Sequence, residues 1–394
     1  MNNFDYYNPV RVIFGEGVID NAGAVVSEYG KKALIVSYTD VSFYGDLFDK
    51  IHKSLEASGI EYSDYFAIEA NPTIAQAKAG MEKCKEVGAD ILIGVGGGSV
   101  MDCTKVIAAG MKYPHPDIRT MICFSHSDGS QIPPTDSLPT VMIPTLPATG
   151  SEMNPTAVIT DEETVRKSYV WAPDCLYPKA ALVDPSLSKT LPKYQTACAG
   201  LDTIAHTVEG YFNGDLDINL DLQDRLQEGL IRTVLDNLPK VIAKPSDIQT
   251  RGVMQWASAI ALNGWVLSGT YTWAPMHQMG HVLGARYNAT HGATLAVMII
   301  AWMKFFQTRK DNSRYVQFAE RLFGKSLKDA TAEFEAIVEN SGVQTRITGL
   351  GASEKDIDML VDDVVRVSFG ADGQLASSPS LTKEDIATIY RLAL

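Results

Sequence analysis

The chain lacks a long apolar run, an excess of basic residues and a leader-like beginning, and each absence excludes a class of protein. The most apolar stretch, residues 295–306, is too short to span a bilayer and contains Lys304, so we expect a buried helix there. Lysine and arginine number 34 against 47 acidic residues, and the formal net charge of −13 argues against nucleic-acid or anionic-membrane binding. The first residues show no basic segment followed by an apolar one, so we expect no secretory signal, a cytoplasmic location and small molecules as partners.

Cysteine is also scarce. The five cysteines are odd in number and widely spaced, and no two of them form a C-x-x-C pair. This pattern argues against a zinc knuckle or a redox dithiol, and it is most simply that of small buried residues in a reducing compartment. They are Cys84, Cys103, Cys123, Cys175 and Cys198.

The first half of the chain alternates apolar runs typical of strands with stretches of helical period. Strands are predicted at residues 10–14, 33–37, 62–68, 91–95 and 140–143. Helices are predicted between them at residues 47–57, 74–87 and 100–110. Strands separated by helices indicate βαβ units, so we predict a Rossmann-like, largely parallel sheet in a domain spanning residues 1–190.

Beyond residue 184 almost every apolar stretch has helical period. Helices are predicted at residues 194–212, 220–238, 248–266, 275–285, 292–306, 313–322, 327–340, 354–367 and 382–394, the last with Thr382 and Asp385 in capping-box positions. We therefore predict a second, all-helical domain at residues 191–394, with a ligand cleft between the domains. Trp256, Asn263, Trp265 and Trp273 fall on these segments as candidates for the pocket lining, although large aromatic residues more often belong to a core.

The most informative stretch is residues 276–292, MHQMGHVLGARYNATHG, which carries three of the seven histidines. His277 and His281 are four residues apart, about one helical turn, so both imidazoles leave the same helix face. His291 follows after a short polar turn. Asp202 and His206 repeat the four-residue spacing on another predicted helix.

A single Asp/His pair of this kind is usually only a helix-surface contact. Three histidines close together among apolar and small residues are harder to explain in that way, because buried imidazoles need partners and one metal ion satisfies several. The two pairs and the further histidine together favour a site for a divalent cation.

A glycine-rich turn, Gly96-Gly97-Gly98-Ser99, follows the predicted strand at residues 91–95 and precedes a helix. Such a turn lets backbone N–H groups approach an anion, and the helix start adds its positive end. The segment therefore favours a nucleotide pyrophosphate, although it matches the G-x-G-x-x-G fingerprint imperfectly. Asp102 and Lys105 follow on the same helix, where they would bind the cofactor or each other.

Residues 144–152, PTLPATGSE, also follow a strand and offer the hydroxyl groups of Thr145, Thr149 and Ser151. Ligands of open α/β sheets lie at the carboxyl ends of the strands, where this segment is expected. The alternative is a loop stiffened by proline, which is the commoner meaning of such a composition.

These segments resemble, in order and spacing and over essentially the whole chain, the iron-containing (group III, metal-dependent) alcohol dehydrogenases. The resemblance is strongest to the branch of butanol dehydrogenases and NADPH-dependent aldehyde reductases. It rests on NPVRVIFGEG, GGGSVMDCTK, PTLPATGSEMN, LDTIAHTVE and MHQMGHVLGARYNATHG. It implies a homodimer or larger homo-oligomer that interconverts small primary alcohols and aldehydes by hydride transfer with a nicotinamide cofactor.

The resemblance also implies roles for particular residues. The metal ligands would be Asp202, His206, His277 and His291, with Fe²⁺ favoured and Zn²⁺ as a substitute. His281 would lie near the nicotinamide without binding metal, either as a proton relay or only as an orienting group; both roles stay open.

For the cofactor, the resemblance implies that the pyrophosphate lies on Gly97, Gly98 and Ser99. Asp102, Thr145, Thr149 and Lys167 would line the rest of the groove, with Arg166 as an alternative to Lys167.

Cofactor preference depends on the segment after the second strand. NAD-preferring relatives carry an aspartate there and the reductase branch carries glycines, whereas this chain has Tyr38-Thr39-Asp40-Val41-Ser42. Thr39 and Ser42 would bind a 2′-phosphate, and Asp40 would repel it if turned inward. The branch resemblance favours NADP(H) over NAD(H). Alternative functions are a glycerol dehydrogenase-like or other polyol or lactaldehyde oxidoreductase, or a non-catalytic metal- or nucleotide-binding protein.

Overall fold

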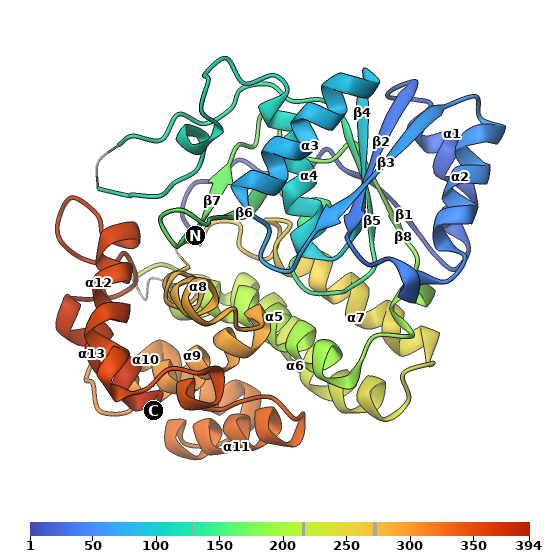
Figure 1. Ribbon diagram of the computed structural model, residues 1–394. Helices are drawn as coiled ribbons and strands as arrows, with labels where there is room; N and C mark the ends of the chain where they lie inside the picture. The colour runs from blue at the N-terminus through green and yellow to red at the C-terminus, as the bar shows by residue number, and fades with distance from the viewer. Residues whose placement is uncertain (128, 215–216, 271–273) are drawn as a thin grey trace.

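A computed structural model describes residues 1–127, 129–214, 217–270 and 274–394, and it has an α/β half and a helical half (Figure 1). The main sheet has the order β1-β8-β5-β4-β2-β3, and all its pairs are parallel. Its strands are β1 (Arg11–Phe14), β2 (Lys32–Tyr38), β3 (Glu61–Ile68), β4 (Ile91–Gly96), β5 (Thr140–Pro144) and β8 (Ala180–Val183). The parallel sheet and its five predicted strands are confirmed.

Helices cover both faces of the sheet. Helices α1 (Ala22–Val26) and α2 (Leu47–Ala57) lie on one face, and α3 (Ile74–Val87) and α4 (Gly98–Gly110) lie on the other (Figure 1). Successive residues of β2 enter different cores: Leu34 belongs to the α3/α4 side and Ile35 to the α1/α2 side. Burial on both faces explains why these strands read as continuous apolar runs.

A two-stranded antiparallel hairpin and the strand β8 were not predicted from the sequence. The hairpin consists of β6 (Thr156–Asp161) and β7 (Arg166–Trp171), and it packs between α4 and α8. β7 begins with Arg166, Lys167 and Ser168, which do not read as an apolar strand, and β8 has only four residues. The hairpin matters for function because it brings Lys167 to the helical half.

The helical half consists mainly of α5 (Lys193–Phe212), α6 (Asp221–Ala243), α7 (Ile248–Ala261), α8 (Pro275–Tyr287), α9 (His291–Phe306), α10 (Ser313–Phe318), α11 (Leu327–Asn340), α12 (Ile357–Ser368) and α13 (Lys383–Leu392). Residues 295–306 are confirmed as a buried helix, in which only Lys304 is partly exposed. The capping box of Thr382 and Asp385 is also present.

The prediction that a helix runs to residue 266 was wrong, because α7 ends at Ala261. The domain boundary at residue 191 stays a prediction, and it falls between the end of β8 and the start of α5. None of the helices in the described ranges is both long and apolar enough to cross a bilayer.

Candidate metal and nucleotide site

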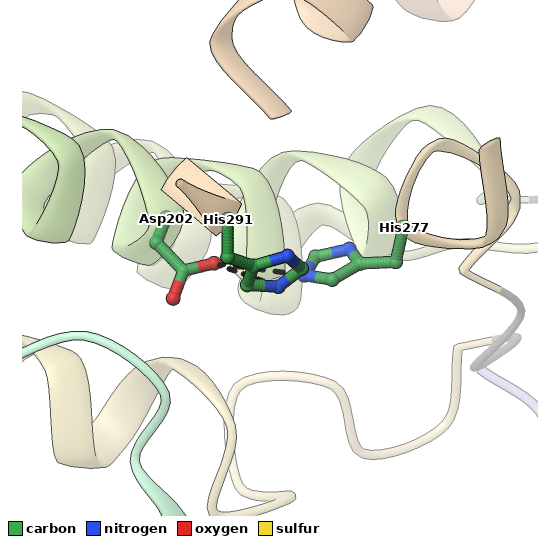
Figure 2. A group of neighbouring side chains, drawn as sticks. All are labelled: Asp202, His277 and His291. Carbon is green, nitrogen blue, oxygen red and sulfur yellow. Dashed lines mark ion pairs between the residues drawn. The ribbon is translucent and has the colours of Figure 1, made fainter. Parts of the chain in front are cut away.

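Three helices bring the predicted metal ligands together. Asp202 and His206 lie one turn apart on α5, His277 and His281 lie on α8, and His291 is the first residue of α9. The Oδ1 atom of Asp202 lies 3.7 Å from Nε2 of His277, 3.6 Å from Nε2 of His291 and 3.8 Å from Nδ1 of His206. The side chains of Asp202, His277 and His291 point toward one another (Figure 2), and their ligand atoms all lie within 4.8 Å.

A glycine contact fixes the distance between α5 and α9. A Cβ atom on Gly292 would lie only 1.9 Å from the carbonyl oxygen of Cys198 on α5, so this position admits no side chain. Cys198 precedes Asp202 by about one turn, and Gly292 follows His291 directly. The close backbone approach therefore sets His291 beside Asp202.

Glu209, two turns after Asp202 on α5, orients His277. Its carboxylate accepts hydrogen bonds from the backbone N–H groups of Met276 and His277 at the start of α8, and it also bonds Nδ1 of the His277 ring. The bond from Nδ1 to Glu209 fixes the orientation of the ring, with Nε2 facing Asp202 and His291. Glu209 was not predicted as a site residue, although the spacing of residues 202, 206 and 209 places all three on one helix face.

The cluster contains buried polar atoms that have no hydrogen-bond partner among the described residues. They are Oδ1 of Asp202, Nδ1 of His206, Nε2 of His277 and Nε2 of His281. Such atoms are costly to bury unsatisfied. A divalent cation held by Asp202, His206, His277 and His291 would satisfy the first three of these atoms, so this donor set fits a metal ion.

Burial also sets the charges of these groups. It lowers the pKa of His281 and His291 well below 6.5 and that of His206 to about 4. Burial raises the pKa of Asp202, but the neighbouring His206, His291 and His277 outweigh it and hold that pKa below its usual value. Burial lowers the pKa of His277, whereas Glu209 and Asp202 raise it to about 9. At neutral pH the carboxylate is ionised and His206, His281 and His291 keep free lone pairs.

The glycine-rich turn lies at the strand-to-helix junction that the sequence predicted. Gly97 precedes α4 and Gly98 is its first residue. A Cβ atom on Gly98 would lie 2.4 Å from the side chain of Thr149, and one on Gly97 would lie 2.9 Å from the Tyr38 hydroxyl. Tyr38, Thr149 and the turn are therefore neighbours, beside the free N–H groups that a helix start presents.

Thr145 and Asp40 differ in their surroundings. The hydroxyl of Thr145 is buried and lies 2.9 Å from that of Tyr44. Asp40 is exposed at the end of β2, and its Oδ1 accepts the backbone N–H of Ser42 at 2.9 Å. Tyr38 turns inward instead, and burial raises its pKa to about 12.

Asp102 and Lys105 have partners inside the α/β half. Asp102 accepts hydrogen bonds from Ser151 Oγ at 2.6 Å and from the backbone N–H of Val158 at 2.9 Å. Lys105 donates to Ser151, to both oxygens of Asn154 and to the Thr156 carbonyl. The two residues share Ser151 rather than bonding each other, and they tie residues 151–158 to α4.

Lys167 lies where the hairpin meets α8. Its Nζ donates to Asn71 at 2.7 Å, and Asn71 donates to Asn288 at the end of α8 at 2.8 Å. Burial lowers the pKa of Lys167 to about 8. Lys167 and His281 line one pocket, so the predicted cofactor residue and the predicted relay residue are brought together.

Trp256 and Trp265, which the sequence offered as candidates for the pocket lining, do not belong to a core. Trp256 and Trp265 are 41% and 45% exposed. Asn263 is buried, and its carbonyl accepts a hydrogen bond from Asn8. Trp273 lies outside the described residues.

Comparison with known proteins identifies the family over most of the chain. The profile described as iron-containing alcohol dehydrogenase matches residues 9–185, and that of the family's C-terminal region matches residues 196–394. The chain is 33% identical to the probable NADH-dependent butanol dehydrogenase 1 of Bacillus subtilis and 31% identical to the NADPH-dependent aldehyde reductase YqhD of Escherichia coli, with all of each chain covered. A crystal structure of NADH-dependent butanol dehydrogenase A from Thermotoga maritima superimposes with a TM-score of 0.92 at 33% identity, covering 100% and 99% of the two chains.

The fold and these relatives define the class of protein: an oxidoreductase that acts on CH–OH groups with a nicotinamide cofactor. Within that class the chain belongs to the iron-containing alcohol dehydrogenase family, near the butanol dehydrogenase and aldehyde reductase branch. The resemblance drawn from the sequence motifs is confirmed.

Proposed function

We propose that this enzyme interconverts short primary alcohols and aldehydes at a divalent metal held by Asp202, His206, His277 and His291. The observation that carries the proposal is that ligand atoms of Asp202, His277 and His291 lie within 4.8 Å of one another. Nδ1 of His206 lies 3.8 Å from Oδ1 of Asp202 and has no hydrogen-bond partner in the described chain. A cation bound there supplies Lewis-acid polarisation of the carbonyl group. The relatives named butanol dehydrogenase and aldehyde reductase support short aldehydes as substrates.

The chain's own residues supply the positioning. Glu209 holds the His277 ring, and His281 stands beside it with a free Nε2 as the proton relay or as an orienting group. Gly97, Gly98 and Ser99 would hold the pyrophosphate, and Thr145, Thr149 and Lys167 would line the groove toward the ligand cluster. The iron-containing family favours Fe²⁺. Zn²⁺ would be its substitute, because three imidazoles and a carboxylate suit both ions.

For the cofactor we now favour NAD(H), in place of the NADP(H) preference that the branch resemblance suggested. Asp40 is an exposed carboxylate at the end of β2, and it already binds the Ser42 amide that a 2′-phosphate would need. A carboxylate at this place repels a phosphate and accepts ribose hydroxyls. Relatives named NADH-dependent match at 32–33% identity, and one named NADPH-dependent matches at 31%.

We also propose a homodimer. Strand β1 is an edge of the sheet and pairs only with β8 within the described chain. Beside it the exposed rings of Phe14 and Trp256 lie 6.1 Å apart. An open strand edge with apolar neighbours favours pairing with a second copy. Light scattering coupled to size exclusion tests this, and a monomer at micromolar concentration would contradict it.

The central experiment is an anaerobic assay with butyraldehyde that follows NADH and NADPH oxidation, with Fe²⁺ or Zn²⁺ added and after chelation. We expect turnover that chelation abolishes and that is faster with NADH. A folded, metal-loaded protein that oxidises neither cofactor would refute the short-aldehyde proposal.

A further inference from the structure

A pocket lies between β7, α8 and α12, and His281 forms part of its wall. The ring of His281 stacks on that of His291 with 5.3 Å between centroids. None of the four proposed metal ligands lines the pocket. The pocket therefore adjoins the ligand cluster but is separate from it.

The charged side chains around this pocket are mostly cationic: Arg166, Lys167 and Arg366, with Asp363 as the one carboxylate among its lining residues. Asp363 is shared between two guanidinium groups, because it accepts Arg286 at 2.6 and 2.9 Å and Arg366 at 2.6 Å. The pocket thus has an excess of positive charge in a chain whose net charge is −13.

Arg166 and Lys167 form no ion pair within the described ranges. Lys167 donates to the neutral amide of Asn71. Asp161, the cross-strand neighbour of Arg166, is bound by Arg119 instead, as is Glu163 in the same hairpin. Two partly or fully buried cations without a carboxylate are costly, and an anion in the pocket would offset that cost.

Polar atoms without partners also line the pocket. In the part of the chain that the structure describes, Nε of Arg166, Nε2 of His126 and Nε2 of His281 are buried and make no hydrogen bond, and neither does Oε1 of Gln278. His281 is only 7% exposed. The Nε–H of Arg166 is always a donor, and a tautomer or amide flip makes the others donors. The geometry suits a group that brings several acceptors, as an oxyanion does.

We propose that this pocket binds a small oxyanion, the carboxylate of an aldehyde acid, so that the enzyme prefers aldehydes with a distal acid group to plain ones. The proposal rests on the proposed aldehyde reduction. Hydride from the reduced cofactor and one proton convert the aldehyde to the hydroxy acid, and the pocket residues only bind the distal group. A plain alkyl chain would leave Arg166 unpaired.

The test compares 4-oxobutanoate with butanal, which have the same number of carbons, in the metal-loaded enzyme. We expect kcat/KM to favour 4-oxobutanoate by at least about tenfold, and Arg166→Gln to remove most of that preference. Arg225→Gln is the matched control, because Arg225 is an exposed guanidinium on α6 that pairs with Asp221. A purely structural or cofactor-binding role of Arg166 would lower kcat/KM for both aldehydes equally, and that result would overturn the proposal.

A second measurement does not depend on turnover. Succinate is titrated calorimetrically into the metal-free wild-type, Arg166→Gln and Arg225→Gln proteins. Succinate binding that is kept in wild type and Arg225→Gln but lost in Arg166→Gln would support the oxyanion pocket. If both aldehydes are nevertheless turned over equally, the occupant is a free anion, and the preference for aldehyde acids is refuted. Such binding without any aldehyde reduction would refute the proposed function and keep the pocket. The absence of both preference and Arg166-dependent binding would refute the pocket itself.

Discussion

Each half of the molecule has one buried cluster of charged side chains. The two clusters differ in how many of their polar atoms have hydrogen-bond partners. Lys105 and Asp102 on α4 are 0% and 7% exposed, and Asp202 and His277 in the helical half are 2% and 7% exposed. The Lys105 ammonium has four acceptors within 3.1 Å, and both Asp102 oxygens accept hydrogen bonds. In the helical half Oδ1 of Asp202 and Nε2 of His277 have no hydrogen-bond partner among the described residues.

Burial alone therefore does not distinguish a structural cluster from a functional one. The α4 cluster is complete and holds residues 151–158 in place. The Asp202 cluster has atoms without hydrogen-bond partners in the described chain. We propose that an added ion supplies the missing partner, so these residues should contribute to binding more than to folding. Variants in the two clusters should therefore differ in whether they lose metal affinity or folding stability.

The largest effect is expected for Asp202→Asn, which keeps the size of the side chain and removes its charge. Metal affinity should fall about 100-fold and kcat/KM at least about 10³-fold, while the metal-free protein loses less than about 2 kcal/mol of unfolding free energy. Chelator competition, steady-state kinetics and urea unfolding measure the three quantities. Retained metal affinity would refute the ligand assignment.

Lys105→Met should show the reverse pattern. Four acceptors lose their donor, so the free energy of unfolding should fall by about 3 kcal/mol. Metal affinity should stay within about threefold, because Lys105 contacts no ligand. Urea unfolding with and without metal tests this, and a large loss of metal affinity at unchanged stability would erase the contrast between the clusters.

Gly292→Ala acts through packing. The new Cβ would meet the Cys198 carbonyl at 1.9 Å, so α9 must move, at a cost of about 2 kcal/mol and with weaker metal binding as His291 shifts. Gly229→Ala on α6 is the control, because nothing lies within 4 Å of its Cβ position and it should be neutral or stabilising. Equal effects of the two substitutions would show that the α5–α9 contact is not what places His291.

Glu209→Gln keeps an acceptor for the backbone N–H groups of α8 and removes the charge opposite His277. We expect metal affinity to fall about tenfold with thermal stability of the metal-free protein nearly unchanged. If the metal-free Glu209→Gln protein unfolds at a lower temperature than wild type and its metal affinity is unchanged, Glu209 serves only as a helix cap.

How far the sequence predicted this site depends on how local each signal is. The pairs Asp202/His206 and His277/His281 follow from helical spacing within one segment, and β1 to β5 follow from apolar runs. The meeting of α5 with α9 depends on Gly292 against Cys198, a contact across about 90 residues that no local pattern encodes. The hydrogen bonds of Asp102 come from Ser151 and Val158, so its role was equally hidden.

The smallest effect on stability is expected at Glu152, a buried carboxyl group beside the cluster of Asp102 and Lys105 in the α/β half. It is 1% exposed near Lys105, yet its Oε1 has no hydrogen bond to the described residues. Burial raises its pKa from 4.5 to about 7. Between these values the folded protein binds more protons than the unfolded chain, so the contribution of Glu152 to stability is present at low pH and is lost as pH rises to 7. Glu152→Gln should therefore gain stability relative to wild type as pH rises from 5 to 8 in urea unfolding, whereas Glu384→Gln, at a side chain 82% exposed, should not. A flat difference would mean that Glu152 is as well satisfied as its neighbours Asp102 and Lys105.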